Sequence, residues 1–172
     1  MSNCKWLSNL DFQSSFTQIG LEESSQPLRA FTYKGNRYQW KRLVMGTKSA
    51  SAEWSRALQM LFTKVPFESL VLYVDDMLLW SEDEETHLKK LRFVLERLEW
   101  GNLKLNPEKT KLFQKECAFL GRKISQSGIR LDEDKVKAIQ ALPPPTSVKE
   151  VQKVLGALNW NRQHVKHFAS LA

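Results

Sequence analysis

Two aspartates interrupt the most apolar stretch of this chain, which runs from Leu70 to Trp80 with Asp75 and Asp76 as its charged residues. Apart from these two aspartates, nearly all positions of the stretch are apolar. Strand side chains alternate between two faces, so apolar residues lie on both faces. The pattern therefore predicts a tight hairpin that is covered on both faces and carries two carboxylates at its tip. Adjacent ionised carboxylates beside apolar strands repel each other and favour a compensating cation. A solvated Asp-Asp turn is the alternative, because aspartate is also a common turn residue.

A third carboxylate, Asp11, lies near the end of another segment with strand character, Trp6 to Phe12, where the strand gives way to a turn. If the two strands lie side by side, Asp11 comes close to Asp75. Carboxylate oxygens are typical ligands of Mg²⁺, which commonly joins one or two carboxylates to substrate phosphates. Three such groups can hold two divalent ions, which activate an attacking hydroxyl and steady the leaving group in a displacement at phosphorus.

The chain around these carboxylates is basic, with a net charge of +7 and an isoelectric point near 9.5. Such a balance favours polyanionic partners, nucleic acid first. A metal ion between carboxylates and phosphates explains an acidic cluster inside a basic chain. The two cysteines, Cys4 and Cys117, form no disulfide framework. No apolar run reaches the roughly 20 residues that a membrane span needs, so we expect no membrane partner.

Periodicity predicts a mixed α/β fold of the α+β kind, with an antiparallel sheet backed by helices at 49–64 and 82–100. A capping box of Ser81 and Glu84 is expected to start the second helix. Its leucines are expected to form one buried stripe: Leu88, Leu91, Leu95 and Leu98. Other elements are expected as a hairpin at 31–40, a hairpin over 117–131 turned at 126–128, a helix at 132–142, and a helix capped by Ser147 and Glu150 after the break at 143–145.

Several motifs in a fixed order resemble those of reverse transcriptases. They are Leu7-Ser-Asn-Leu-Asp11 followed by Phe16, Tyr73-Val-Asp-Asp76, Leu105-Asn-Pro-Glu-Lys109 and Phe119-Leu-Gly-Arg-Lys-Ile124. The stretch from Leu142 to Gly156 is similar to the gypsy-like branch of LTR retrotransposons, to which retroviral enzymes are related. The resemblance covers essentially the whole chain. It implies an RNA-directed DNA polymerase from a polyprotein, with a palm at 1–142, partial fingers at about 27–45 and the start of a thumb or connection at 143–172.

The resemblance also implies roles for the matching residues. Asp11, Asp75 and Asp76 correspond to ligands of two Mg²⁺ or Mn²⁺ ions, and Lys109 to a lysine that protonates or steadies pyrophosphate. Phe16 matches the bulky residue that excludes a ribose 2′-hydroxyl. A core aromatic and a solvated lysine are the alternatives for Phe16 and Lys109. Nucleotide contacts are implied for Phe12, Phe16, Met45 and Gly46, and nucleic-acid contacts for Tyr73, Phe119, Leu120, Gly121, Arg37 and Lys41.

The stretch from Val44 to Ala50 departs from the Pro-Phe-Gly and Asn-Ala-Pro sequences that are common in the family, so metal binding is more firmly implied than nucleotide handling. Expected partners are an RNA or DNA template with its primer and deoxynucleoside triphosphates, in the cytoplasm, the nucleus or virus-like particles. Only ten residues precede Asp11, whereas the family's fingers begin farther upstream. We therefore expect a fragment with little activity by itself. The alternative is a non-catalytic remnant that binds nucleic acid or a protein partner.

Overall fold

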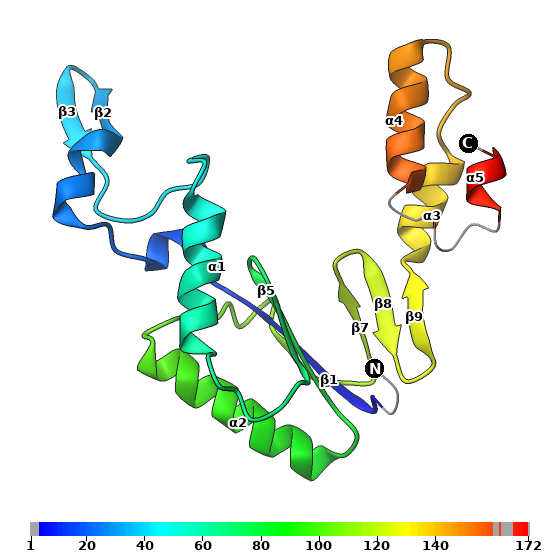
Figure 1. Cartoon of the computed structure of the whole chain (residues 1–172), viewed down its shortest axis with the longest axis horizontal. Coiled ribbons are helices and arrows are strands. Elements are labelled where there is room, and N and C mark those ends of the chain that lie inside the picture. The colour runs from blue at the N-terminus through cyan, green and yellow to red at the C-terminus, as the bar shows by residue number, and fades with distance from the viewer. Residues whose placement is uncertain (1–3, 160–161, 163–166, 172) are drawn as a thin grey trace.

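The computed structural model describes residues 4–159, 162 and 167–171, and it confirms a mixed fold of helices and antiparallel sheets (Figure 1). The strands are β1 (Trp6–Asp11), β2 (Ala30–Tyr33), β3 (Asn36–Gln39), β4 (Leu70–Tyr73), β5 (Asp76–Ser81), β6 (Lys111–Gln114), β7 (Glu116–Phe119), β8 (Arg122–Ser125) and β9 (Gly128–Leu131). The α-helices are α1 (Ala50–Leu61), α2 (Glu84–Trp100), α3 (Glu133–Gln140), α4 (Val148–Asn159) and α5 (Phe168–Leu171). Short 3-10 helices span Ser15–Gln18, Glu23–Ser25 and Pro27–Arg29.

The central sheet has the strand order β4-β5-β1-β6, and all its pairs are antiparallel. The two apolar runs around Asp75 and Asp76 form β4 and β5, as predicted. Strand β1 lies beside β5 along its whole length, from Trp6 opposite Ser81 to Asp11 opposite Asp76. The sheet therefore joins the start of the chain to a hairpin more than 60 residues later.

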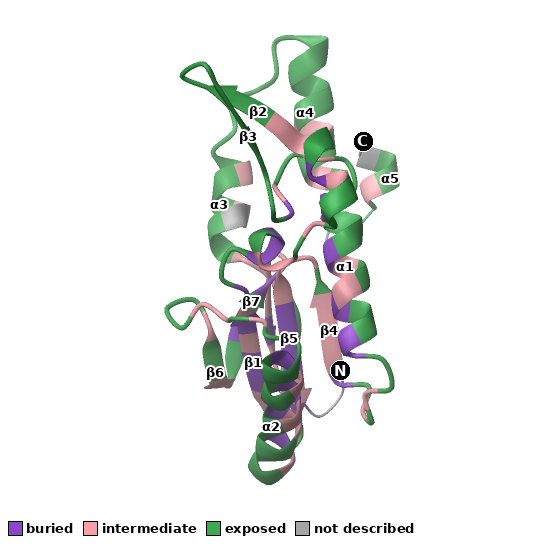
Figure 2. Cartoon of the chain, turned by 90° about the vertical axis from the view of Figure 1, so that its left-hand side faces the viewer, coloured by how far each residue is buried: buried purple, intermediate pink, exposed green. Residues whose placement is uncertain are grey.

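Both faces of this sheet are covered, as the apolar flanks predict. On one face, Leu10, Met77 and Leu79 pack with buried residues of α1 and α2. On the other face, Leu7 and Leu78 pack with buried residues of β7 and β8. Figure 2 shows the buried residues concentrated on β1, β5 and the inner side of α1. Alternation along each strand explains this split, because neighbouring side chains point to opposite faces.

Two peripheral parts extend from this base on opposite sides (Figure 1). One is the predicted β2–β3 hairpin, which turns at Lys34 and Gly35 with φ angles of 49° and 78°. The other is the β7-β8-β9 sheet with α3, α4 and α5 beyond it. The predicted hairpin over 117–131 requires residues 117–124 to form one continuous strand as its first arm, and this is wrong. Leu120 and Gly121 have φ angles of 50° and 74°, and this two-residue turn separates β7 from β8.

The start and the buried face of α2 also differ from the prediction. Asp83 caps the helix by accepting a hydrogen bond from the Thr86 amide at 2.8 Å, whereas Ser81 is the last residue of β5. Leu88 and Leu95 are 52% and 41% exposed, while Leu91 and Leu98 are buried. The buried face also contains His87 and Val94, so the stripe is rotated towards these two residues.

The C-terminal elements follow the expected punctuation. Residues 143–145 separate α3 from α4. Ser147 caps α4 as predicted, because the Glu150 backbone amide donates to Ser147 Oγ at 3.3 Å. The Glu150 carboxylate accepts from the backbone amide of Thr146, one residue before the cap, at 2.7 Å. None of the helices in the described parts has the length and apolar character needed to cross a membrane. The boundary at 142–143 between palm and thumb stays a prediction.

Candidate functional site

The backbone brings the three predicted carboxylates together. Asp11 is the last residue of β1 and pairs with Asp76, the first residue of β5. Asp75 directly precedes Asp76, in the turn that follows β4. Paired residues on adjacent antiparallel strands lie about 4.5–5.5 Å apart. The adjoining ends of the two inner strands thus bring together three acidic residues from two distant parts of the sequence.

The turn that carries Asp75 is held in an unusual conformation. Val74 has a φ angle of +49°, which is rare for a β-branched side chain because its Cβ crowds the backbone. Trp54 of α1 is completely buried, and its indole Nε1 donates to the Val74 carbonyl oxygen at 2.7 Å. Helix α1 therefore holds the turn in place through Trp54, and the packing of this side chain together with its hydrogen bond offsets the local backbone strain.

The electrostatics of the site fit a place for cations. The pKa of the Asp76 carboxyl is raised, first by burial and then by the negative charges of Asp11 and Asp75, against a smaller lowering by Lys109. The Lys109 ammonium lies 4.0 Å from Asp11 Oδ1 and is 67% exposed. Asp75 Oδ1 is buried and has no hydrogen-bond partner within the part of the chain that the structure describes. A buried carboxylate oxygen without a partner is costly unless a cation or water satisfies it.

The donor set suits a hard divalent cation, because it consists of carboxylate oxygens. Across the described residues, however, no group of three or more His, Cys, Asp or Glu side chains is arranged so that it could hold a metal ion. The strand register therefore supplies the right residues on neighbouring positions, but the side chains as placed do not form a complete ligand set.

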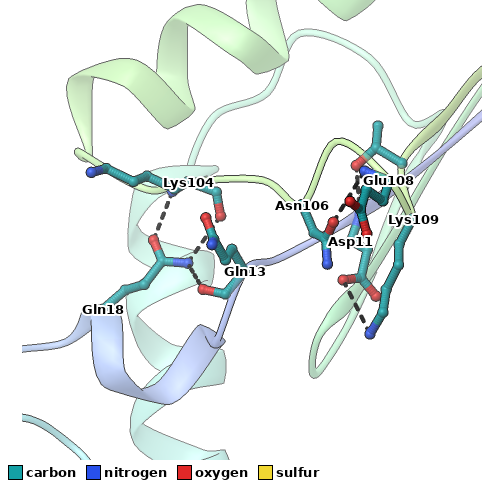
Figure 3. Close-up of polar contacts among 8 residues, drawn as sticks. Asp11, Gln13, Gln18, Lys104, Asn106, Glu108 and Lys109 are labelled. Atoms are coloured by element: carbon teal, nitrogen blue, oxygen red, sulfur yellow. Dashed lines mark hydrogen bonds and ion pairs between the residues drawn. The ribbon is translucent and has the colours of Figure 1, made fainter.

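The segment from Lys104 to Thr110 lies against the end of β1 and is hydrogen-bonded to Asp11 (Figure 3). The Asn106 amide donates to the Asp11 carbonyl oxygen at 2.8 Å, and the Asp11 amide donates to Thr110 Oγ1 at 3.3 Å. Asn106 Oδ1 also accepts from the Glu108 amide at 3.1 Å, which shapes the turn that presents Lys109. The motif around Lys109 was visible in the sequence, but the supporting roles of Asn106 and Thr110 were missed. An Asn-Pro pair is a turn signal that points to the former.

Gln18 ties the same segment to the loop after β1, a role that the sequence did not indicate. Its Nε2 donates to the carbonyl oxygens of Gln13 at 2.6 Å and Lys104 at 2.9 Å. Its Oε1 accepts from the Lys104 amide at 2.6 Å, so the side chain bonds both backbone groups of Lys104. Figure 3 shows Gln18 between the two segments. The side-chain amide of Gln18 therefore bonds the backbone of Lys104 in the way that the backbone of a neighbouring strand would.

The residues implied for nucleotide contacts have diverse surroundings. Phe12 and Phe16 are buried, and both pack edge-on against Trp54 with ring centroids 4.9 Å and 6.4 Å away. Phe16 is therefore a core aromatic in this structure, and its role in nucleotide selection stays a prediction. Met45 is exposed, and Gly46 has a φ angle of +84°.

The residues implied for nucleic-acid contacts are spread over three parts of the molecule. Tyr73 is exposed and pairs with Asp76 at the end of β4. Phe119 is buried against the far face of the central sheet, beside the Leu120–Gly121 turn. Arg37 lies on β3 and Lys41 just after it, and both are exposed. They belong to the peripheral β2–β3 hairpin and not to the central sheet that carries the carboxylates. Their proposed roles stay predictions.

Comparisons with known proteins agree with the motif pattern. A family model described as "Reverse transcriptase (RNA-dependent DNA polymerase)" matches residues 1–124. The chain is 37% and 33% identical over 172 residues to retrovirus-related Pol polyproteins from transposons opus and gypsy of Drosophila melanogaster, covering 100% of this chain and 17% of each relative. It thus spans a small part of these curated relatives.

Solved structures show the same fold. A foamy viral protease-reverse transcriptase in complex with double-stranded DNA matches with a TM-score of 0.92 and 29% identity, covering 99% of this chain and 30% of that chain. A foamy viral protease-reverse transcriptase in complex with an RNA/DNA hybrid matches with a TM-score of 0.83 and 30% identity, covering 94% of this chain and 22% of that chain.

Proposed function

This chain belongs to the reverse transcriptase (RNA-dependent DNA polymerase) family, and we propose that it is the catalytic palm of an RNA-directed DNA polymerase within a retrotransposon Pol polyprotein. The observation that supports this most is the pairing of Asp11 with Asp76, with Asp75 in the adjoining turn. Template-directed nucleotidyl transfer needs carboxylates at one point next to a nucleic-acid surface, and this register supplies them.

The chain's own residues would bind and orient the reactants. Asp11, Asp75 and Asp76 would hold two Mg²⁺ or Mn²⁺ ions, which supply activation of the primer hydroxyl and neutralisation of phosphate charge when bound. The unpartnered Asp75 Oδ1 and the oxygen-only donor set support this assignment. Lys109, beside Asp11, would place an ammonium near the departing pyrophosphate, where fixed positive charge stabilises developing negative charge.

The remaining contacts would hold the substrates. We propose a palm at 1–142, a partial fingers region at 27–45 and the start of the thumb or connection at 143–172. Met45 and Gly46 would approach the nucleotide, and the Phe119–Gly121 turn would position the primer end. The net charge of +7 and the nucleic acids bound by the two foamy viral structures support a primer–template as the partner and deoxynucleotides as co-substrates.

Primer extension tests this proposal directly. The assay uses a Pol protein that contains this chain, a labelled primer on an RNA template, deoxynucleotides and Mg²⁺. Asp75→Asn and Asp11→Asn are expected to abolish extension while primer–template binding persists. Glu68→Gln removes an exposed carboxylate elsewhere and serves as the matched control, with extension at the wild-type rate. Extension by Asp75→Asn at that rate would refute the proposal.

A second function, a remnant that binds nucleic acid without catalysis, is favoured by the lack of an assembled ligand set among the described side chains. It predicts salt-sensitive binding of primer–template that Asp75→Asn leaves unchanged, and no extension with either Mg²⁺ or Mn²⁺. Extension by the wild-type protein eliminates this alternative.

A further inference from the structure

Asp75 lacks the support that strand pairing gives to the other two carboxylates of the candidate site. Asp11 and Asp76 face each other on β1 and β5, so the hydrogen bonds of the sheet hold their backbones. Asp75 instead lies in a two-residue turn with Val74, between the paired residues Tyr73 and Asp76. The position of the Asp75 carboxylate therefore depends on the conformation of this turn, which we call the 74–75 turn.

The sequence of the 74–75 turn does not favour the conformation that it adopts. In two-residue hairpin loops, a first residue with a positive φ angle is usually glycine, asparagine or aspartate. Here that residue is Val74, with a φ angle of +49° and a stiff, branched side chain. Strained backbone of this kind persists only where the surrounding structure restrains it. The turn that carries Asp75 therefore needs a restraint from outside the hairpin.

Trp54 supplies this restraint from a rigid position in α1, which lies alongside β4 (Figure 2). Its side chain is completely buried, and its indole Nε1 donates to the Val74 carbonyl oxygen at 2.7 Å. The indole also packs edge-on against Phe12, at 4.9 Å and 85° between the rings, and Phe12 directly follows Asp11. One buried side chain thus contacts both the strand end that carries Asp11 and the turn that carries Asp75.

We propose that Trp54 is a positioning residue for metal binding, whose indole N–H holds the strained 74–75 turn so that Asp75 can share divalent cations with Asp11. This inference rests on the proposed function and gives a role in it to a residue that touches neither metal nor substrate. Asp75 Oδ1 is buried without a hydrogen-bond partner among the described residues, so it is available to a cation. Bonds that orient metal ligands typically change the metal affinity by on the order of tenfold or more.

The first test removes the indole N–H and keeps the shape of the ring. Benzothienylalanine at position 54 replaces the N–H by sulfur, and Trp54→Phe is the simpler variant. Mn²⁺ alone is titrated into the full chain, and free Mn²⁺ is measured by electron paramagnetic resonance. Each variant is expected to bind Mn²⁺ more weakly by on the order of tenfold, and amide hydrogen exchange is expected to speed at 74–76 but not along β1. Asp75→Asn shows how much of the binding belongs to this site.

Primer extension separates positioning from a general loss of stability. In a Pol protein that contains this chain, each Trp54 variant is expected to need on the order of tenfold more Mg²⁺ for half of its maximal rate. The maximal rate and the KM for primer–template are expected to stay close to the wild-type values. Val94→Ala is the control, because it truncates a completely buried residue of the same apolar cluster on α2. It is expected to lower the urea midpoint but to leave the Mn²⁺ affinity and the Mg²⁺ requirement unchanged.

A glycine at position 74 tests whether the bond of Trp54 acts by restraining strain. Glycine adopts a positive φ angle without a steric penalty, so Val74→Gly relaxes the 74–75 turn. Removing the indole N–H is therefore expected to reduce the Mn²⁺ affinity by a smaller factor in Val74→Gly than in the wild type. Equal factors in the two backgrounds would overturn the proposal, because they would show that the restraint is not needed.

Two further results would overturn the role of Trp54. One is an unchanged Mn²⁺ affinity in the benzothienylalanine variant, and the other is a loss of affinity in Val94→Ala as large as that in Trp54→Phe. If Asp75→Asn loses Mn²⁺ binding and extension while the Trp54 variants keep both, the positioning role alone fails. If Asp75→Asn extends primers at the wild-type rate, the proposed function itself fails.

Discussion

Mild acid is expected to destabilise this protein through one buried histidine. His87 of α2 is completely buried. Its Nε2 lies 2.7 Å from Ser8 Oγ on β1, and its Nδ1 lies 3.2 Å from Ser81 Oγ on β5. Burial, and to a smaller extent the charge of Lys90, lowers the pKa of His87 from 6.5 to about 4. Neutral His87 thus joins the helix to the two strands that carry Asp11 and Asp76.

The sign and size of the effect follow from that shift. Because the pKa of His87 is lower in the folded state, the unfolded chain binds more protons between pH 6.5 and about 4, and stability falls as the pH drops through this range. At roughly 1.4 kcal/mol per pKa unit, the full loss amounts to about 3 kcal/mol. Around pH 5 it is already about 2 kcal/mol.

Urea unfolding of the wild type and of His87→Gln, each at pH 7.5 and pH 5, measures this loss. Glutamine stays neutral and can still bond a serine hydroxyl, so the variant is expected to lose about 2 kcal/mol less than the wild type between the two pH values. Asp76, whose pKa is raised, contributes in the opposite sense, with stability that is lost as the pH rises. A pH dependence that is identical in the wild type and in His87→Gln would refute the reasoning.

Three further substitutions test the supports of the site. Trp54→Phe removes the hydrogen bond to the Val74 carbonyl oxygen and is expected to lower the free energy of unfolding by about 1–3 kcal/mol in urea, with Trp100→Phe as the silent control. Asp83→Ala removes the observed cap of α2 and is expected to lower the Tm by a few degrees, whereas Glu84→Gln is expected to leave the Tm nearly unchanged. A larger loss of Tm in Glu84→Gln than in Asp83→Ala would instead support a capping box of Ser81 and Glu84. Gln18→Leu removes the hydrogen bonds of this side chain to Lys104 and is expected to speed amide hydrogen exchange across 104–110 but not in α2. Equal acceleration in both segments would contradict a local role for Gln18.

The strands of the site could be predicted because their signals are local. Apolar runs on both sides of Asp75 and Asp76 specify a covered hairpin, and the segment from Trp6 to Phe12 specifies a third strand. The register that sets Asp11 opposite Asp76 follows from burial, because a slip by one residue would turn Leu10 away from the core. Among the sheets that these strands could form, the resemblance of the motifs to reverse transcriptases favours the one in which the strand of Asp11 lies beside the hairpin of Asp75 and Asp76.

The remainder depends on tertiary contacts that no local pattern encodes. Leucine spacing alone placed Leu88 and Leu95 inside, but the sheet meets α2 on the face of His87 and Val94. The polar His87 is accommodated there because Ser8 and Ser81 reach it from two strands. Likewise, the Leu120–Gly121 turn lies in an apolar stretch with a single glycine, which reads as a continuous strand until the backbone is seen.

The two halves of the candidate site are held in place by contacts of different strength, so the proposed catalysis is expected to be disturbed more easily at one half than at the other. The carboxylates are held by the β1–β5 register, and the strained Val74 turn is fixed by a buried tryptophan. The Lys109 loop instead depends on hydrogen bonds of Asn106, Thr110 and Gln18, and Lys109 itself is mostly exposed. Exposed loops open at lower free energy than packed strands. If Lys109 acts on the leaving group and the carboxylates hold metal ions, as proposed, perturbing this loop is expected to impair leaving-group stabilisation while the carboxylates, and metal binding with them, stay in place.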